Sequence, residues 1–79
     1  MTKNELRDRI AAALEIDPSR LHDDASPKNI KEWDSVGALG ILSVMDEATA
    51  GGVSSEDALG FLSFAAIVEF ARRKGFMSE

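Results

Sequence analysis

The apolar residues of this 79-residue chain recur at the three- and four-residue intervals of helices, and no stretch alternates apolar and polar residues as a half-buried strand does. Three stretches carry the helical spacing: residues 3 to about 15, 35 to about 50, and 64 to 74. A fourth, between Ser54 and Gly60, fits one or two turns. We therefore predict an all-α fold, a four-helix bundle with three long helices and one short third helix. A chain of this length, residues 1–79, makes a single domain.

Capping and stop signals bound these helices. Thr2 and Glu5 have the spacing of a capping box. The first helix should end within residues 14–16, because Pro18 cannot continue it and disfavours helical angles at Asp17. Gly51-Gly52 should end the second helix. The third helix should begin at Ser54 or Ser55 and end at Gly60, and the last should begin at Ser63 and end at Gly75-Phe76. The inner face of the last helix should comprise Phe64, Ile67, Val68 and Ala71, with Phe70 at its margin.

Residues 17–33 have no helical periodicity and form a loop of unusual length for a small domain. A short helical turn at residues 27–31 is compatible with the sequence. The apolar residues expected to anchor this loop are Ile16, Leu21, Ile30 and Trp33. A long crossover between two helices is a known bundle topology, so the loop agrees with the all-α prediction.

The second helix carries more apolar surface than one buried face needs. At about 100° per residue, one broad arc should face the core: Ala38, Ile41, Leu42, Met45 and Ala48. The opposite, outer line comprises Val36, Gly40, Ser43 and Glu47, with Leu39 and Val44 beside it. Gly37 also falls on this outer side, and the two glycines cost about 0.8–1 kcal/mol each relative to alanine. Close approach of a partner to the backbone is one possible compensation.

The composition excludes several classes of function. Without cysteine there is no disulfide framework, no Cys-ligated zinc and no thiolate catalysis. The net charge of −5 disfavours nucleic acid and favours protein partners with basic patches. No apolar run approaches the ~20 residues of a membrane span, so we expect a soluble, cytoplasmic protein without a membrane partner. His22 beside two loop carboxylates is typical of solvated surface, and we predict no metal site and no catalytic residue.

Asp34 and Ser35 open the second helix. The Asp34 carboxylate suits the N-cap, where it accepts from an unpaired amide of the first turn. Ser35 then becomes the first helical residue, near the positive end of the helix dipole. A phosphate joined to its hydroxyl would lie where exposed amides and the dipole both favour negative charge.

The whole pattern resembles the acyl carrier protein family from Leu6 to Phe70. A helix, a long loop, an Asp-Ser-aliphatic start of a second helix, a short third helix and a closing fourth follow in the family's order. The matching fragments are Leu14-Glu15-Ile16-Asp17-Pro18 for an "LGIDP"-like helix end, Trp33-Asp34-Ser35-Val36 for the "xDSL" site, Val53-Ser54 for "I-P", and Ser63-Phe64 for "T-V". Each fragment alone is weak, and the ordered set at these spacings is specific.

The resemblance implies a non-enzymatic carrier. Ser35 would hold a 4′-phosphopantetheine arm transferred from coenzyme A by a phosphopantetheinyl transferase, and acyl groups would ride as thioesters on its thiol. Asp34 would cap the helix and help the transferase recognise the site. Further partners would be acyl-activating, acyltransferase or synthase enzymes, and the carrier would be a monomer. The residues expected to contact partners are Val36, Leu39, Gly40, Ser43 and Glu47.

The second helix departs from the fatty-acid carriers, whose outer face is rich in acidic residues. Only Asp46 and Glu47 are acidic here, which favours a specialised fatty-acid, polyketide or related pathway. Two alternatives stay open. One is an unmodified helical interaction module with the carrier fold. The other is an aminoacyl or peptidyl carrier, whose site usually has Gly-Gly before the His/Asp-Ser-Leu, unlike Glu32-Trp33-Asp34-Ser35. A hydrolytic triad of Ser35, His22 and Asp34 lacks a nucleophile elbow and is disfavoured.

Overall fold

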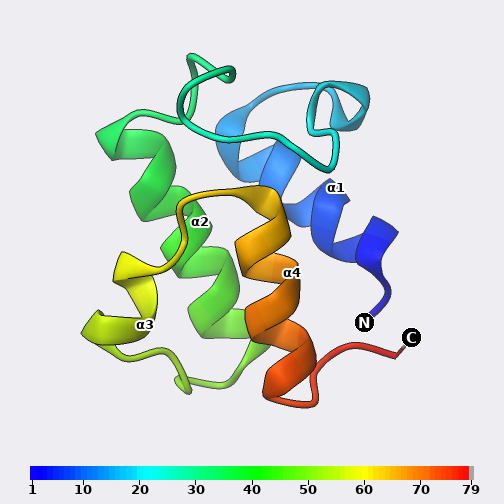
Figure 1. Cartoon of the computed structure of the whole chain (residues 1–79), viewed down its shortest axis with the longest axis vertical. Coiled ribbons are helices and arrows are strands. Elements are labelled where there is room, and N and C mark those ends of the chain that lie inside the picture. The colour runs from blue at the N-terminus through cyan, green and yellow to red at the C-terminus, as the bar shows by residue number, and fades with distance from the viewer. Residues whose placement is uncertain (79) are drawn as a thin grey trace.

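A computed structural model describes residues 1–78 of the chain (Figure 1). Its elements are α1 (Lys3–Leu14), the 3₁₀ helix η1 (Pro18–Arg20), α2 (Ser35–Ala48), α3 (Ser55–Leu59) and α4 (Phe64–Arg73). No strand occurs within residues 1–78, so the all-α prediction is confirmed. No helix in this described part is both long and apolar enough to cross a membrane. Figure 1 shows the long loop after α1 crossing one end of the molecule before the chain enters α2.

The predicted caps form as expected. At the start of α1 the Glu5 amide donates to the Thr2 hydroxyl at 3.1 Å, and the Thr2 amide donates to the Glu5 carboxylate at 3.1 Å. Ser54 and Asp57 make the same reciprocal pair at α3, with both bonds at 3.0 Å. Such pairs satisfy two backbone donors that a helix start otherwise leaves open. The third helix is only five residues long.

The core is built from all the long helices and from the loop. Its buried members are Leu6, Ile10, Ala11, Leu14, Leu21, Ala25, Ile30, Trp33, Ile41, Met45, Phe61, Phe64, Ile67, Val68, Phe70 and Ala71. Phe70 is fully in the core rather than at its margin, where it packs edge-on against Phe61 with ring centroids 5.1 Å apart. Ala38, predicted to face inward, is exposed. The arc of α2 that the core takes is therefore narrower than predicted.

The loop is anchored much as the sequence indicates. Leu21, Ile30 and Trp33 are buried, and Ile16 is half-buried against the core. Ala25 was not predicted as an anchor, yet it is buried and its carbonyl accepts from the Phe64 amide at 2.9 Å. This bond ties the middle of the loop to the first residue of α4.

The helical turn in the loop lies earlier than predicted. It is η1, where Asp17 caps Ser19 at 2.9 Å, and residues 27–29 form only a hydrogen-bonded turn. Arg7 of α1 then binds Asp23 at 2.7 Å, which adds a second tie between loop and helices. These two ties hold the loop against α4 and α1.

Gly37 and Gly40 correct the predicted outer line of α2. Both face the protein's own chain: a Cβ on Gly37 would lie 2.2 Å from the Glu32 carbonyl oxygen, and one on Gly40 would lie 3.3 Å from the carbonyl oxygen of Ala13 in α1. The glycines thus permit close packing of α1 and the loop against α2. Their cost in helix propensity is offset inside the molecule rather than by a partner.

The helix ends are also set by local chemistry. α2 stops at Ala48, two residues before the predicted end, where the buried Thr49 hydroxyl donates to the Met45 carbonyl at 2.8 Å. After α4, Gly75 has φ +81° and the Phe76 amide donates to the Ala71 carbonyl at 2.9 Å, which is the predicted glycine stop. The Ser78 amide donates to the Met1 carbonyl at 2.7 Å, so the first and last described residues lie side by side.

Candidate functional site

Ser35 is the exposed first residue of α2. Before it, Asp34 adopts extended angles, and its carboxylate accepts from the Gly37 amide at 2.9 Å, as the predicted N-cap requires. The amides of Ser35 and Val36 make no hydrogen bond to another residue of the described chain. The Ser35 hydroxyl is likewise without a partner within residues 1–78. The start of α2 thus presents one free hydroxyl beside two free amide donors.

The backbone before Ser35 is held by three contacts. Trp33 is buried in the core with only 4% of its surface exposed. The Glu32 carboxylate accepts two hydrogen bonds from the Arg20 guanidinium, at 2.8 and 2.9 Å. These bonds, with a further one from its own backbone, lower the pKa of Glu32 to about 2. The Glu32 carbonyl lies against Gly37. We call this set, Arg20, Glu32, Trp33 and Gly37, the attachment frame.

Large apolar side chains are exposed near the start of α2 and around the end of α3. The four large hydrophobic residues that are most exposed in the described chain are Val36 at 77%, Leu39 at 67%, Leu59 at 77% and Leu62 at 69%. We call these four the apolar collar. Val36 and Leu39 were predicted as partner contacts, whereas Leu59 and Leu62 were missed. The one feature of the sequence that could have indicated their exposure is that neither leucine lies on the predicted inner face of a helix.

Two hollows are lined by members of the collar other than Val36. The first, about 430 Å³ and open, is lined by Ser35 itself together with Trp33, Ala38, Leu59, Phe61 and Leu62, among others. The second, about 140 Å³, lies between α2 and α3 and is lined by Trp33, Leu39, Ile41, Leu42, Ala58 and Phe61, with Ala38. Ala38, which the sequence assigned to the core, therefore lines both hollows beside Ser35.

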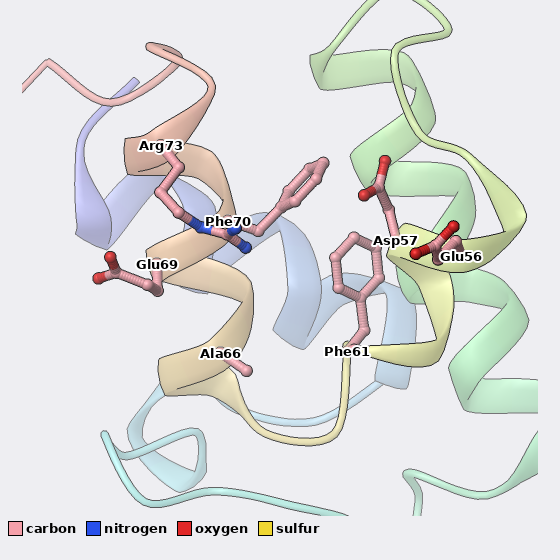
Figure 2. Close-up of a pocket in the computed structure, with 8 residues that line it drawn as sticks. Glu56, Asp57, Phe61, Ala66, Glu69, Phe70 and Arg73 are labelled. Atoms are coloured by element: carbon pink, nitrogen blue, oxygen red, sulfur yellow. The ribbon is translucent and has the colours of Figure 1, made fainter.

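Phe61 lines both hollows and also a third pocket. Figure 2 shows this pocket between α3 and α4, with Phe61 and Phe70 pointing toward one another at its floor. Glu56 and Asp57 line it from α3, and Arg73 lines it from α4. The pocket measures about 300 Å³. Phe61 is therefore shared by a pocket with carboxylates in its lining and by the two apolar hollows.

The other predicted partner contacts lie further along α2. Ser43 and Glu47 are exposed, beyond the collar, while Gly40 is half-buried against α1. Val44 and Glu47 line an open groove with Arg9 and two alanines of α1. The predicted line of five residues is thus split, and only Val36 and Leu39 lie close to Ser35.

His22 is not brought to Ser35. Its Nδ1 pairs with the Asp24 carboxylate, and both side chains are more than half exposed. The Asp34 carboxylate faces the Gly37 amide instead of a histidine. Within residues 1–78 no three His, Cys, Asp or Glu side chains gather as a metal site would need. The contacts of His22 and Asp34 therefore do not assemble the Ser35, His22 and Asp34 triad.

No family model matches the chain, and no curated protein or solved structure is significantly similar to it.

Proposed function

We propose that the protein is an acyl carrier protein. It holds acyl groups as thioesters on a 4′-phosphopantetheine arm joined to Ser35, and it delivers them to partner enzymes without catalysing a reaction itself. The observation that carries the proposal is the exposed Ser35 at the start of a 14-residue helix, with the Ser35 and Val36 amides free. These amides and the helix dipole favour the phosphodiester that the arm would place there.

The order of helices supports the same proposal. Three helices of 12, 14 and 10 residues and one of five occur in the order of the carrier pattern, which we interpret as a four-helix bundle. The long loop lies between the first two helices, and the Asp34-Ser35-Val36 site opens the second. The matching fragments therefore fall at the element boundaries where a carrier has them.

The apolar collar and hollows indicate the class of cargo and partner. An apolar acyl chain on the arm would be sheltered from water against Trp33, Leu39 and Phe61, gaining about 25 cal/mol for each Å² buried. The collar is uncharged, so docking of partner enzymes depends more on apolar contacts than on acidic residues of α2. We infer a specialised fatty-acid, polyketide or related pathway in the cytoplasm, with a monomeric carrier.

The test is modification by coenzyme A and a broad-specificity phosphopantetheinyl transferase. Intact mass should rise by one arm per chain in the wild type and in Ser43→Ala, since Ser43 is an exposed serine on the same helix. Ser35→Ala should gain nothing. An unmodified wild type, or a gain that survives in Ser35→Ala, would remove the proposal.

A second candidate is an unmodified interaction module with the same fold. The observation that favours it is the apolar collar itself, which can bind a partner without any arm. In that case protein from native cells would carry no arm, and partner binding would be equal in the wild type and Ser35→Ala. An aminoacyl or peptidyl carrier would differ from the main proposal in the thioester cargo found on native protein.

A further inference from the structure

The ion pair between Arg20 and Glu32 joins two parts of the loop that are twelve residues apart, and it does so directly before Ser35. We infer that Arg20 and Glu32 are positioning residues for modification of Ser35: their pair holds the start of α2 in the form that the transferase binds. This inference rests on the proposed function. Neither side chain touches the reacting hydroxyl, so both act through the backbone between them and the serine.

The geometry of the pair suits this role. Two parallel hydrogen bonds, at 2.8 and 2.9 Å, fix the carboxylate in position and in orientation, which a single bond does not. Arg20 is the last residue of η1, a segment held by its own cap at Asp17. Glu32 lies only three residues before Ser35. The pair therefore fixes the backbone before Ser35 relative to η1, a structured part of the loop.

A movement of Glu32 would be passed on to the helix start. Its carbonyl oxygen sits so close to the Gly37 backbone that no side chain fits between them. Gly37 in turn donates to the Asp34 carboxylate that caps α2. Glu32 and Asp34 thus both contact Gly37 across the exposed Ser35, so loosening of Glu32 should weaken the cap as well.

Loss of the pair should act locally rather than on the whole fold. Both side chains are partly exposed, and exposed ion pairs contribute little to global stability. The buried Trp33 remains as an anchor. Suppose that without the pair the start of α2 is in its binding-competent form about a quarter of the time. The apparent KM then rises about fourfold, because the apparent dissociation constant is the intrinsic one divided by the competent fraction. The rate constant of the bound complex does not change.

Arg20→Gln and Glu32→Gln separate positioning from charge. The first makes the protein more acidic and the second less so. Positioning predicts that KM of the carrier in the transferase reaction rises about fourfold in both, with kcat within twofold. Steering of the transferase by overall charge predicts opposite changes. The exchange Arg20→Glu with Glu32→Arg rebuilds the pair and should return KM to within twofold of the wild type.

Asp23→Asn is the matched control. It removes another exposed carboxylate ion pair of the same loop, the one with Arg7 and Lys3, without touching the attachment frame. Its KM should equal that of the wild type. Hydrogen exchange gives a readout that needs no transferase: the Gly37 amide should exchange faster in Arg20→Gln and Glu32→Gln than in Asp23→Asn.

The outcomes distinguish the two proposals. A wild type that accepts no arm overturns the proposed function, and the positioning inference with it. A wild type that is modified normally, with KM and Gly37 exchange unchanged in Arg20→Gln and Glu32→Gln, overturns the inference alone. A fall in kcat at constant KM in both variants also contradicts it, since that would place the residues in the chemical step.

Discussion

Replacement of Gly37 by alanine tests the close packing of the loop on α2 most directly. Helix propensity alone predicts that the free energy of unfolding rises, whereas packing predicts that it falls. Gly37 lies in the first turn of α2, where alanine alone would stabilise a helix by about 1 kcal/mol. The structure places the new methyl carbon 2.2 Å from the Glu32 carbonyl oxygen and 2.8 Å from Leu14 Cδ2. The leucine tip can turn aside, but the carbonyl belongs to the backbone.

The expected loss follows from these two contributions. Overpacking of a well-filled site costs about 1–3 kcal/mol, and a backbone obstacle argues for the upper end of that range. Subtracting the gain of about 1 kcal/mol in helix propensity leaves a net destabilisation of about 2 kcal/mol. At about 4–8 °C per kcal/mol for a domain of this size, Tm should fall by about 8–16 °C.

Urea unfolding followed both by helical circular dichroism and by the fluorescence of Trp33, the one tryptophan of the chain, measures this change. Gly40→Ala is the control on the same helix, because its methyl would lie 3.3 Å from the Ala13 carbonyl oxygen and needs only small adjustments. We expect that variant within about 1 kcal/mol of the wild type. A Gly37→Ala protein as stable as the wild type, or more stable, would refute the close packing of the loop on α2.

Three further predictions concern the cap of α3, acid stability and docking. Ser54→Ala removes the capping box of a five-residue helix and should cost about 1 kcal/mol, seen as a lower urea midpoint and faster amide exchange in α3; unchanged exchange would show that the cap is not needed. The pKa of Glu32 is lowered to about 2 by Arg20, so this group stabilises the fold above its ordinary pKa of 4.5, and that contribution is lost as the pH falls from 4.5 toward 2. Because the pair is partly exposed, the effect on unfolding should be small: the urea midpoint of Glu32→Gln should depend slightly less on pH in this window than that of the wild type, and a Glu32 carboxyl that titrates at its ordinary pKa in the wild type would contradict the ion pair. Val36→Asp changes a side chain that is 77% exposed, so Tm should stay within a few degrees while partner enzymes bind more weakly; a large fall in Tm would show that Val36 is part of the core.

The helices and their caps could be predicted because their causes are local. Thr2 with Glu5, and Ser63 before α4, act on amides within three residues, so spacing alone identifies them. The same holds for Asp34 as the cap of α2. Ser35 could be singled out for this reason: its place at a helix start depends only on its neighbours in sequence.

The face that each residue of α2 presents could not be predicted in full. A helical wheel gives angles between residues but not which neighbours cover them, and here the loop covers Gly37 while α1 covers Gly40. Ala38 was assigned to the core for the same reason, and it lines the hollows beside Ser35 instead. Leu59 and Leu62 belong to the collar only because the tertiary structure brings α3 and the start of α4 beside α2.

The sequence by itself determined that the chain is helical, where its helices begin and which serine opens α2, because periodicity and capping act over a few residues. Only the tertiary structure decided what surrounds that serine. The pair of Arg20 with Glu32, the carbonyl against Gly37 and the apolar collar all join segments that are distant in the chain or on different elements. Such contacts depend on how the loop and helices pack, and no local pattern encodes them.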